Sequence, residues 1–478
     1  MKTKRLLALI LACLFLLAGC NSASSPDVTD GSEVPTDAPT DKPTDKPTEA
    51  PTETQAPTEA PTEPIVYTYF TDEENKPLYR VIYPAEAAEV IKHAAELLHA
   101  HLCETTGIEF EISDDSAEVA GEIGEILVGS TNREDSNVDL KGNEYTLKIT
   151  GENIVVTGKN DYSTAVAVKE FIKLFDKNSP GIDEKLSVVA EPSEAYRVAL
   201  TNSKDATIDI YNLIPFSDEP ILERRIQTTA GCTGINFRIH ETHGEVIIVA
   251  SGTRAELLDY DTGKILWYTN YAAPSSHGAE LLPNGVAAIA SSHGNAIRFF
   301  DVDGSRTKYI EVEFKDAHAV LWDPKNELLW GLGETELRAF KVVKAGKNDI
   351  TVTEDMDRYT KLPSNLGHDL APYYYDDDKM WVTVFSKFYI YDKTTKTFIK
   401  EVEGDDGSIV RRRVKGIGNF ADGSMVTAYP DELETSYQTW TTEKINFYFK
   451  LGDKLYYCPF ATPDMHHYKC RIICTDYQ

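Results

Sequence analysis

Imidazole and amine side chains recur just before short apolar runs in the C-terminal half of the sequence, at a spacing that could bring them to one site. Each run leads into a turn, such as Pro283-Asn284-Gly285. If each run is the innermost strand of one propeller blade, the side chains that precede the runs converge on a central channel. These residues are His277, His318, His368, Lys415, and His466 or His467.

Further basic residues are expected on the same rim of a propeller. The loops that enter each blade and the loops between its second and third strands share one rim, because strand one starts on the face where strand two ends. The chain has a formal net charge of -29, so a local excess of cationic and imidazole groups suggests an anionic ligand. The arginine run among them could equally be a solvated strand that pairs with neighbouring acids. The added basic residues are Arg254, His293, Lys387, Arg411, Arg412 and Arg413, and Glu334 is expected on the same rim.

Three interpretations of the channel histidines stay open. Neutral imidazoles that converge on an axis could bind a divalent metal such as Mn, Zn or Ca, with His277, His318 and His368 as ligands. They could instead hydrogen-bond a sugar or another small anion, with Trp381 and Trp440 as stacking platforms. They could also bond to neighbouring blade backbones and line a water-filled channel.

Short strands at a spacing of about 40–45 residues predict the propeller itself. Tyr196–Asn202, Thr207–Asn212 and Ile221–Gln227 fit strands two to four of a blade that lacks its first strand, and His467–Asp476 can supply it. We therefore expect residues 193–478 to form an all-β propeller of about six blades with split-blade closure. A β-sandwich of short strands is the alternative, but it does not explain the period.

Residues 66–192 predict a small α+β sandwich domain. Leu78–Tyr83 is strand-like, and Pro84 opens a helix whose apolar residues recur at helical spacing. Tyr145–Thr150 is one of several further strands, and a second helix is expected at Ser163–Phe175.

This pattern resembles the small N-terminal domain of bacterial alpha-glucuronidases and the corresponding domain of beta-hexosaminidases. In those enzymes the domain precedes a catalytic barrel. Because no barrel follows here, the resemblance implies a carbohydrate setting and transfers no catalytic residue. The resembling stretches are residues 94–98 through Thr106-Gly107, residues 125–129, and residues 145–149 through Gly158 and Glu170-Phe171.

The layout of the channel histidines is similar to that of oligogalacturonate lyases and related propeller lyases. The resemblance implies a metal among the histidines that offsets the substrate carboxylate, while a base abstracts the adjacent proton and β-elimination follows. The base residue of those lyases could not be aligned with this sequence. His277 with the turn Leu282–Gly285 also resembles arylsulfotransferase-type propellers, in which a histidine would transfer sulfate.

Residues 1–20 form a targeting segment. Basic residues precede the apolar Leu6–Leu17, and Leu17-Ala18-Gly19-Cys20 matches the bacterial lipoprotein cleavage box. The apolar stretch is too short to span a membrane, so we expect a lipid on Cys20 to anchor the protein at the extracytoplasmic face of the cell membrane. Residues 21–65 repeat Pro-Thr followed by an acid or alanine, which predicts an extended, disordered linker.

Five cysteines follow the lipidated one, and their odd number and spacing predict no disulfide framework. We expect all five to be buried small hydrophobic residues. They are Cys103, Cys232, Cys458, Cys470 and Cys474.

Taken together, these features predict a cell-surface lipoprotein that binds an acidic polysaccharide or oligosaccharide at a channel rich in histidine, lysine and arginine. A metal-dependent lyase that cleaves uronate glycans at the same site is the alternative, and the sequence does not establish turnover. A purely structural or protein-interaction propeller is a further alternative. The acidic surface argues against a nucleic-acid partner. We expect a monomer that meets the membrane through its lipid anchor only.

Overall fold

The computed structural model describes residues 65–119, 121–229, 231–385, 387–399, 413–430 and 440–474. The targeting segment with Cys20, the linker up to residue 64, Arg411 and Arg412 lie outside these ranges. Within the described part of the chain, no helix has both the length and the apolar character needed to cross a bilayer.

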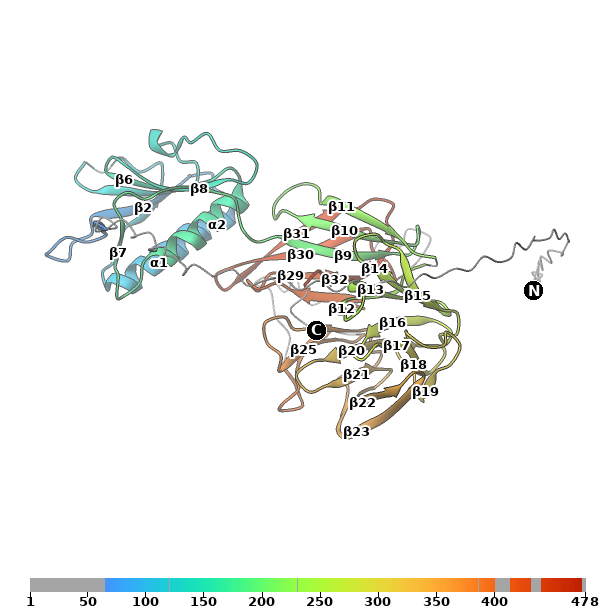
Figure 1. The fold of residues 1–478 in the computed structure, drawn as a ribbon. Coiled ribbons are helices and arrows are strands. Elements are labelled where there is room, and N and C mark those ends of the chain that lie inside the picture. Colours follow the sequence, from blue (N-terminus) through green and yellow to red (C-terminus); the bar gives the residue numbers. More distant parts are fainter. Residues whose placement is uncertain are drawn as a thin grey trace, which may run out of the picture. The chain divides into compact units, whose positions relative to one another are not determined.

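Six four-stranded antiparallel sheets form the blades of a β-propeller (Figure 1). The innermost strand of each blade contacts the innermost strands of its two neighbours, and the contacts continue around the whole ring. The six-bladed propeller predicted from the sequence period is therefore confirmed.

Blade 1 joins two distant parts of the chain. Its innermost strand, β32 (His467–Ile472), pairs antiparallel with β9 (Tyr196–Asn202). The blade continues outward through β10 (Thr207–Leu213) and β11 (Ile221–Gln227). The C-terminal strand thus closes the ring in the blade where the sequence places it, and it ends at Ile472.

Blades 2 to 6 follow one another in sequence order, and each runs from its inner to its outer strand. Blade 2 contains β12 (Gly234–His240), β13 (Gly244–Ser251), β14 (Arg254–Asp259) and β15 (Ile265–Thr269). Blade 3 contains β16 (Ser276–Leu281), β17 (Val286–Ser291), β18 (Ala296–Asp301) and β19 (Ile310–Glu313). Blade 4 contains β20 (Ala319–Asp323), β21 (Leu328–Leu332), β22 (Glu336–Gly346) and β23 (Asp349–Lys361). Blade 5 contains β24 (Asp369–Pro372), β25 (Lys379–Thr383), β26 (Phe388–Asp392) and β27 (Thr397–Ile399). Blade 6 contains β28 (Gly416–Asn419), β29 (Met425–Ala428), β30 (Lys444–Leu451) and β31 (Lys454–Ala461).

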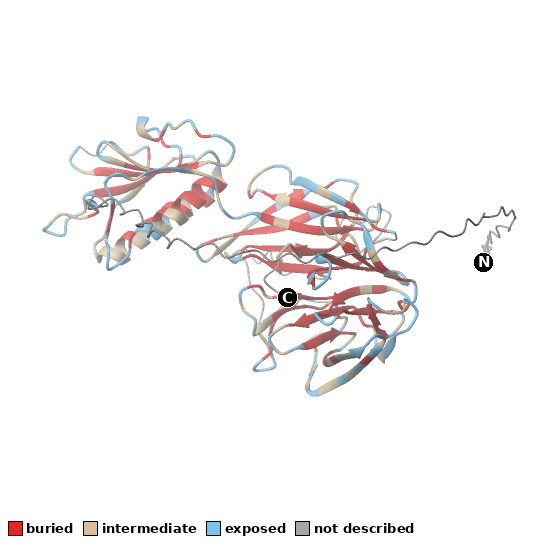
Figure 2. Ribbon diagram, viewed as in Figure 1, coloured by how far each residue is buried: buried red, intermediate tan, exposed pale blue. Residues whose placement is uncertain are grey.

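Burial of a residue follows the radial position of its strand (Figure 2). Every residue of β17 is buried, whereas the outermost strand of the next blade, β23, is mostly exposed or half-buried. Large side chains such as Trp330 and Trp381 fill the space between sheets and are fully buried. Because apolar burial is the main favourable term in folding, this packing of blade against blade holds the channel side chains in place.

Residues 67–190 contain two α-helices, two short 3-10 helices, η1 (Glu134–Ser136) and η2 (Ile172–Leu174), and a six-stranded sheet. The helices α1 (Glu89–Thr106) and α2 (Asp161–Phe171) pack together on one face of this sheet (Figure 1). The Asn160 side chain caps α2 by accepting a hydrogen bond from the Ser163 amide. The helix expected from Pro84 begins at Glu89, after a turn. The sheet order is β3 (Ile112–Asp114), β2 (Tyr79–Tyr83), β4 (Gly124–Val128), β6 (Asn153–Gly158), β5 (Tyr145–Thr150) and β8 (Ser187–Ala190), and β1 (Tyr67–Tyr69) pairs with β7 (Gly181–Asp183).

Candidate ligand-binding site

A repeated backbone turn stands at the entrance of four blades. The residue two positions before each of His277, His318, His368 and Lys415 has a left-handed conformation, with φ between 49° and 59°. A non-glycine residue in this region costs on the order of 1 kcal/mol, so four equivalent instances indicate a conformation that the surrounding fold enforces. The turn residues are Ser275, Asp316, Leu366 and Arg413.

Two β-bulges help to aim side chains at the same rim. The pairing of β16 with β17 shifts register between Ser276 and Gly278, so His277 is an extra residue in its strand. A second register shift in β32 includes Tyr468. Because a bulge redirects the side chain of the extra residue, the rings of His277 and Tyr468 meet, with their centroids 5.5 Å apart.

A pocket of about 460 Å³ opens at this rim. Four residues predicted from the sequence line it: His277, His293, His318 and Lys415. Thr233 also lines it, at the position where the other blades carry histidine or lysine. Blades 2, 3, 4 and 6 thus each contribute at least one of these side chains to the same rim.

Three imidazoles form a continuous cluster at the pocket. The rings of His277 and His318 stack in parallel, with centroids 4.8 Å apart and an interplanar angle of 8°. His368 meets His318 edge to face at 5.3 Å. His368 therefore belongs to the same cluster, although it does not line the pocket itself.

Burial keeps two of these imidazoles, His277 and His368, neutral. It lowers the pKa of His277 to about 2, with a further contribution from His318 and the nearby lysines. Burial and the adjacent Lys415 also hold the pKa of His368 far below its ordinary value. The Nδ1 atom of His277 is buried without a hydrogen-bond partner among the described residues. Neutral rings can stack without charge repulsion and can offer both a donor and an acceptor to a ligand.

Lys415 is the amine of the site. Its Nζ lies 3.2 Å from Nε2 of His368 and 5.6 Å from the centre of the Tyr468 ring. Burial, followed by the charges of Lys469 and Arg413, lowers the pKa of Lys415 to about 7. Within the described residues no carboxylate forms an ion pair with this amine. A bound anion would supply the missing counter-charge.

Asp316 is the carboxylate of the pocket. Nδ1 of His318 lies 3.3 Å from its Oδ1 and 3.1 Å from its backbone oxygen. Burial alone would raise the pKa of Asp316, but the contact with His318 and the neighbouring positive groups lower it. On the other side of the pocket, Nδ1 of His293 lies 2.9 Å from the Ser275 hydroxyl. These contacts orient two imidazoles towards the cavity.

A buried ionic network lies beneath the pocket and connects three blades. The guanidinium of Arg471 in β32 binds both oxygens of Asp369 in β24, at 2.6 and 2.7 Å. Lys469 binds the same carboxylate at 2.8 Å, and Nε of Arg471 donates to Asn236 in β12 at 2.8 Å. Burial opposes charge on Asp369, but Arg471 and Lys469 outweigh it and lower the pKa of the carboxyl. Two basic side chains thus share one buried carboxylate, and burial lowers the pKa of Lys469 while Asp369 opposes that shift.

The remaining predicted residues lie elsewhere. Arg254 stacks on Tyr268, with 4.3 Å between the guanidinium carbon and the ring centre, and it also binds Glu256. Arg413 stands over Phe385 at 5.4 Å and is exposed. These two arginines therefore flank the rim without lining the pocket.

The two C-terminal histidines also lie outside the pocket. The backbone amide of His466 donates to Asn202 in blade 1. His467 is fully buried inside blade 1 against the ring of Tyr211, at 6.0 Å between centroids. The residue that β32 contributes to the pocket is Tyr468 instead, because the strand is irregular at this point.

Sequence reasoning did not single out Asp316, Tyr468 or the network around Asp369. Its spacing could have identified Asp316, because it lies two residues before His318, as Ser275 lies two residues before His277. Both residues line the pocket. No comparable signal marks Tyr468, because its orientation depends on a bulge. Trp440, proposed as a platform, does line the pocket and meets Tyr468 edge to face at 5.4 Å.

A metal held by His277, His318 and His368 stays a prediction. Within the described residues, one group of histidine, cysteine or acidic side chains has three possible ligand atoms within 4.8 Å of one another. This group is His99, Cys103 and Glu109. The parallel stack of His277 on His318 does not bring the channel nitrogens together in this way.

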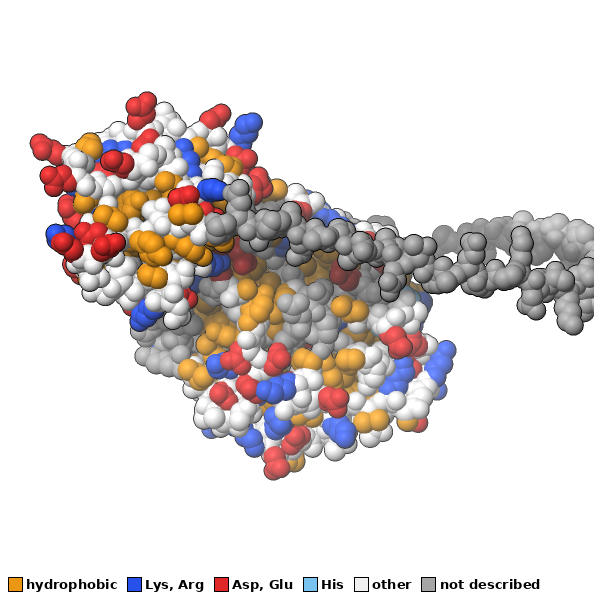
Figure 3. All heavy atoms as spheres, turned by 60° about the vertical axis from the view of Figure 1, so that its left-hand side comes forward, with side chains coloured by type: hydrophobic (Ala, Val, Ile, Leu, Met, Phe, Trp, Pro, Cys, Tyr) orange, Lys and Arg blue, Asp and Glu red, His pale blue; other side chains and the backbone are white. Residues whose placement is uncertain are grey.

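Acidic and basic side chains are interspersed over the surface seen in Figure 3.

The fold is a six-bladed propeller with a pocket lined by polar and aromatic side chains at one rim. Residues 169–463 match the model of a family described as "Family of unknown function (DUF6528)", and the chain belongs to this family. No curated protein matches the sequence. Among solved structures, the chain is similar to the WD40 β-propeller domain of Doa1, with a TM-score of 0.36 and 10% identity over 57% of this chain and 82% of that chain.

Proposed function

We propose that the propeller binds an acidic oligosaccharide, or the end of an acidic polysaccharide, in the pocket between His277, Lys415 and Tyr468. The observation that carries the proposal is Lys415, a buried amine that opens onto the pocket and has no ion-pair partner among the described residues. A carboxylate or sulfate of a ligand would pair with it and would restore its charge.

The charges around the pocket favour an anion. Three basic side chains, Lys415, Lys469 and Arg471, stand against two carboxylates, Asp316 and Asp369. The whole chain carries a formal net charge of -29, so the site is an electropositive spot on an acidic protein. Such local fields select ligands by charge and weaken with salt.

The uncharged groups of the pocket suit a sugar. Ser275, Ser292 and Thr233 bring hydroxyl groups, and the neutral ring of His277 has an unpaired nitrogen among the described residues. Trp440 and Tyr468 place aromatic surface at the same cavity. A volume of about 460 Å³ lies within the range of about 300–1,000 Å³ for small-ligand pockets. A site of this size would hold the terminal part of a glycan and leave the rest outside.

The predicted cell-surface location supports the same proposal. A lipid anchor at Cys20 and a linker over residues 21–65 would hold the propeller outside the membrane, where acidic polysaccharides are accessible. The resemblance of residues 66–192 to accessory domains of glycosidases points to the same setting.

The experiment compares acidic and neutral oligosaccharides of equal length by isothermal titration calorimetry. We expect binding of uronate oligomers, weaker binding at higher salt, and at least a tenfold loss of affinity on Lys415→Met, with partial recovery on Lys415→Arg. Lys264→Met serves as the matched control, because Lys264 is exposed in the turn between β14 and β15, on the opposite rim. Equal binding of acidic and neutral sugars, or unchanged affinity in Lys415→Met, would overturn the proposal.

A further inference from the structure

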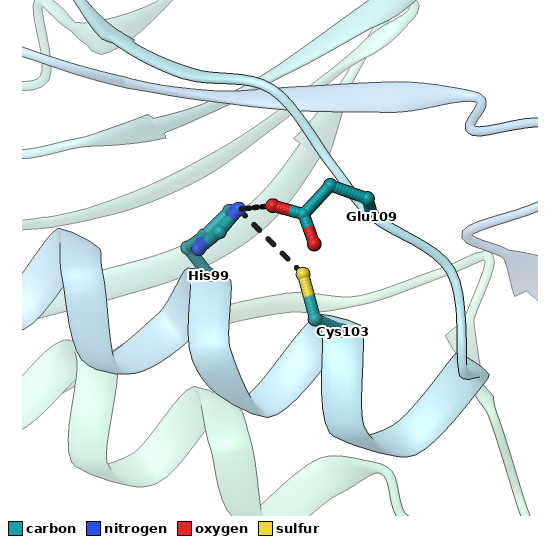
Figure 4. A group of neighbouring side chains, drawn as sticks. All are labelled: His99, Cys103 and Glu109. Atoms are coloured by element: carbon teal, nitrogen blue, oxygen red, sulfur yellow. Dashed lines mark hydrogen bonds and ion pairs between the residues drawn. The ribbon is translucent and has the colours of Figure 1, made fainter.

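The end of α1 brings three metal-binding side chains together, remote from the propeller pocket in sequence. Gly107 ends the helix with a left-handed backbone (φ 74°), and its amide donates to the Cys103 carbonyl. The chain then turns back over the last turns of the helix. As a result, Glu109 stands over His99 and Cys103, which lie one helical turn apart (Figure 4).

The three side chains present nitrogen, sulfur and oxygen to one point. Nε2 of His99 lies 3.6 Å from Sγ of Cys103 and 3.8 Å from Oε1 of Glu109. Tetrahedral zinc with bonds of about 2.05 Å to nitrogen and about 2.3 Å to sulfur places these two atoms about 3.6 Å apart. The Glu109 side chain is 87% exposed, so it can rotate to shorten its own distance.

We propose that His99, Cys103 and Glu109 form a Zn²⁺ site. A thiolate, an imidazole and a carboxylate are the ligand types that zinc accepts in proteins, and two of them sit on a rigid helix at positions i and i+4. The fourth position would be held by water or by the Phe110 carbonyl, which lies 2.8 Å from Nε2 of His99. All three proposed protein ligands belong to the part of the chain that the structure describes.

Binding must rearrange two protons. In the present arrangement Nε2 of His99 donates its hydrogen to the Phe110 carbonyl. For Nε2 to bind zinc, the imidazole proton moves to Nδ1 through solvent, and the ring stays neutral. The Cys103 thiol loses its proton to solvent as the Zn–S bond forms, so each bound ion releases one proton.

This site changes the interpretation of two residues. Cys103 was expected to be a buried small hydrophobic residue, but it is half-buried and contacts an imidazole. Cys474 is half-buried as well, whereas Cys232, Cys458 and Cys470 are buried as expected. His99 contacts three groups: the Phe110 carbonyl, Cys103 and Glu109.

The test uses the full chain and Co²⁺ as a spectroscopic substitute for Zn²⁺. We expect one equivalent of Co²⁺ to produce a thiolate-to-cobalt charge-transfer band in the near ultraviolet, and Zn²⁺ to abolish it by competition. Cys103→Ser should lose the band, and His99→Ala should weaken binding at least tenfold. Cys474→Ser and His101→Ala are the matched controls, because Cys474 is the other half-buried cysteine of the described chain and His101 lies on the same helix.

A second measurement covers variants that fail to fold. The melting temperature of the unmodified protein should rise with Zn²⁺ concentration, and Glu109→Gln should reduce this rise without lowering the melting temperature in the absence of metal, because Glu109 is exposed. Absence of the charge-transfer band, or a band of equal intensity in Cys103→Ser, would overturn the proposal. A band lost in Cys474→Ser would place the metal elsewhere.

Discussion

Arg471 and Asp369 form a bidentate ion pair between blades 1 and 5, which are not neighbours in the ring. The guanidinium and the carboxylate are both almost fully buried, with side-chain exposures of 5% and 0%. The pair therefore connects β32, the last strand of the chain, to β24, which lies two blades away in the ring.

Removing one member of this pair should strongly destabilise the protein. Asp369→Asn leaves Arg471 and Lys469 buried without their counter-charge, and breaking a buried pair in this way costs about 3–5 kcal/mol. Urea unfolding of the variant measures the loss. Glu104→Gln is the control, because Glu104 pairs with Lys177 at the surface, where side-chain exposures are 72% and 65%. A loss no larger in Asp369→Asn than in Glu104→Gln would contradict the prediction.

Deletion of residues 467–478 should open the ring. It removes β32 and exposes the inner edge of β9, together with the faces of the adjoining blades. We expect a marked drop in melting temperature and loss of ligand binding, measured by calorimetry on the truncated protein. Deletion of residues 475–478 alone, which leaves β32 intact, is the control. A truncated protein that melts like the intact one would show that closure does not depend on β32.

His467 should make the fold sensitive to acid. Burial, opposed by the charge of Asp209, lowers the pKa of His467 to about 4, against about 6.5 in an unfolded chain. Between these values the unfolded chain binds more protons, so stability falls as the pH falls from about 6.5 to about 4, by up to about 1.4 kcal/mol per pH unit. The free energy of unfolding of His467→Gln should therefore change less steeply over this range. His101→Gln controls for the loss of an imidazole, and parallel pH profiles of His467→Gln and the unmodified protein would refute the assignment.

Metal content distinguishes the two candidate metal sites, the channel histidines and the group His99, Cys103 and Glu109. In a Cys103→Ser background we expect no stoichiometric metal by elemental analysis, because the channel imidazoles stack rather than converge on one point. Stoichiometric metal that disappears on His277→Ala with His318→Ala would instead establish the channel as the metal site. Cleavage of uronate oligomers with a rise in ultraviolet absorbance, lost in the same double variant, would then identify a lyase.

Cys20→Ala tests the predicted location. The lipoprotein box assigns the membrane attachment to this residue alone, so the variant should leave the membrane fraction while keeping the melting temperature of the unmodified protein. Cys13→Ala, within the apolar stretch of the same segment, is the control. Continued membrane partition of Cys20→Ala would refute the anchor.

The fold could be predicted from the sequence because the blade repeat is periodic. The spacing of the marked residues predicted the shared rim, and His277, His293, His318 and Lys415 do meet there. Tyr468 was missed because an irregular pairing of β32 with β9 changes which residue faces the pocket. The alternation of residues along a strand does not reveal such an irregularity. The ion pair of Arg471 with Asp369 depends on how blades are arranged across the ring, which no local pattern encodes.

The low pKa of Lys415 has a similar origin. It results from burial and from Lys469, which lies far away in the sequence. The spacing of the basic residues and the propeller topology predicted a cationic rim, but they could not show that this amine has no ion-pair partner among the described residues.

The pocket is completed by blade 1, whose innermost strand, β32, is synthesised last. The amide of Lys469 donates to Thr201 across 268 residues of chain, and a contact at this separation forms late, because the intervening loop must first be ordered. Tyr468, a wall of the pocket, and Lys469, a charge beneath it, arrive on the same strand. A nascent or prematurely terminated chain would therefore carry five of the six innermost strands, so the pocket would be complete only once the whole propeller has been made.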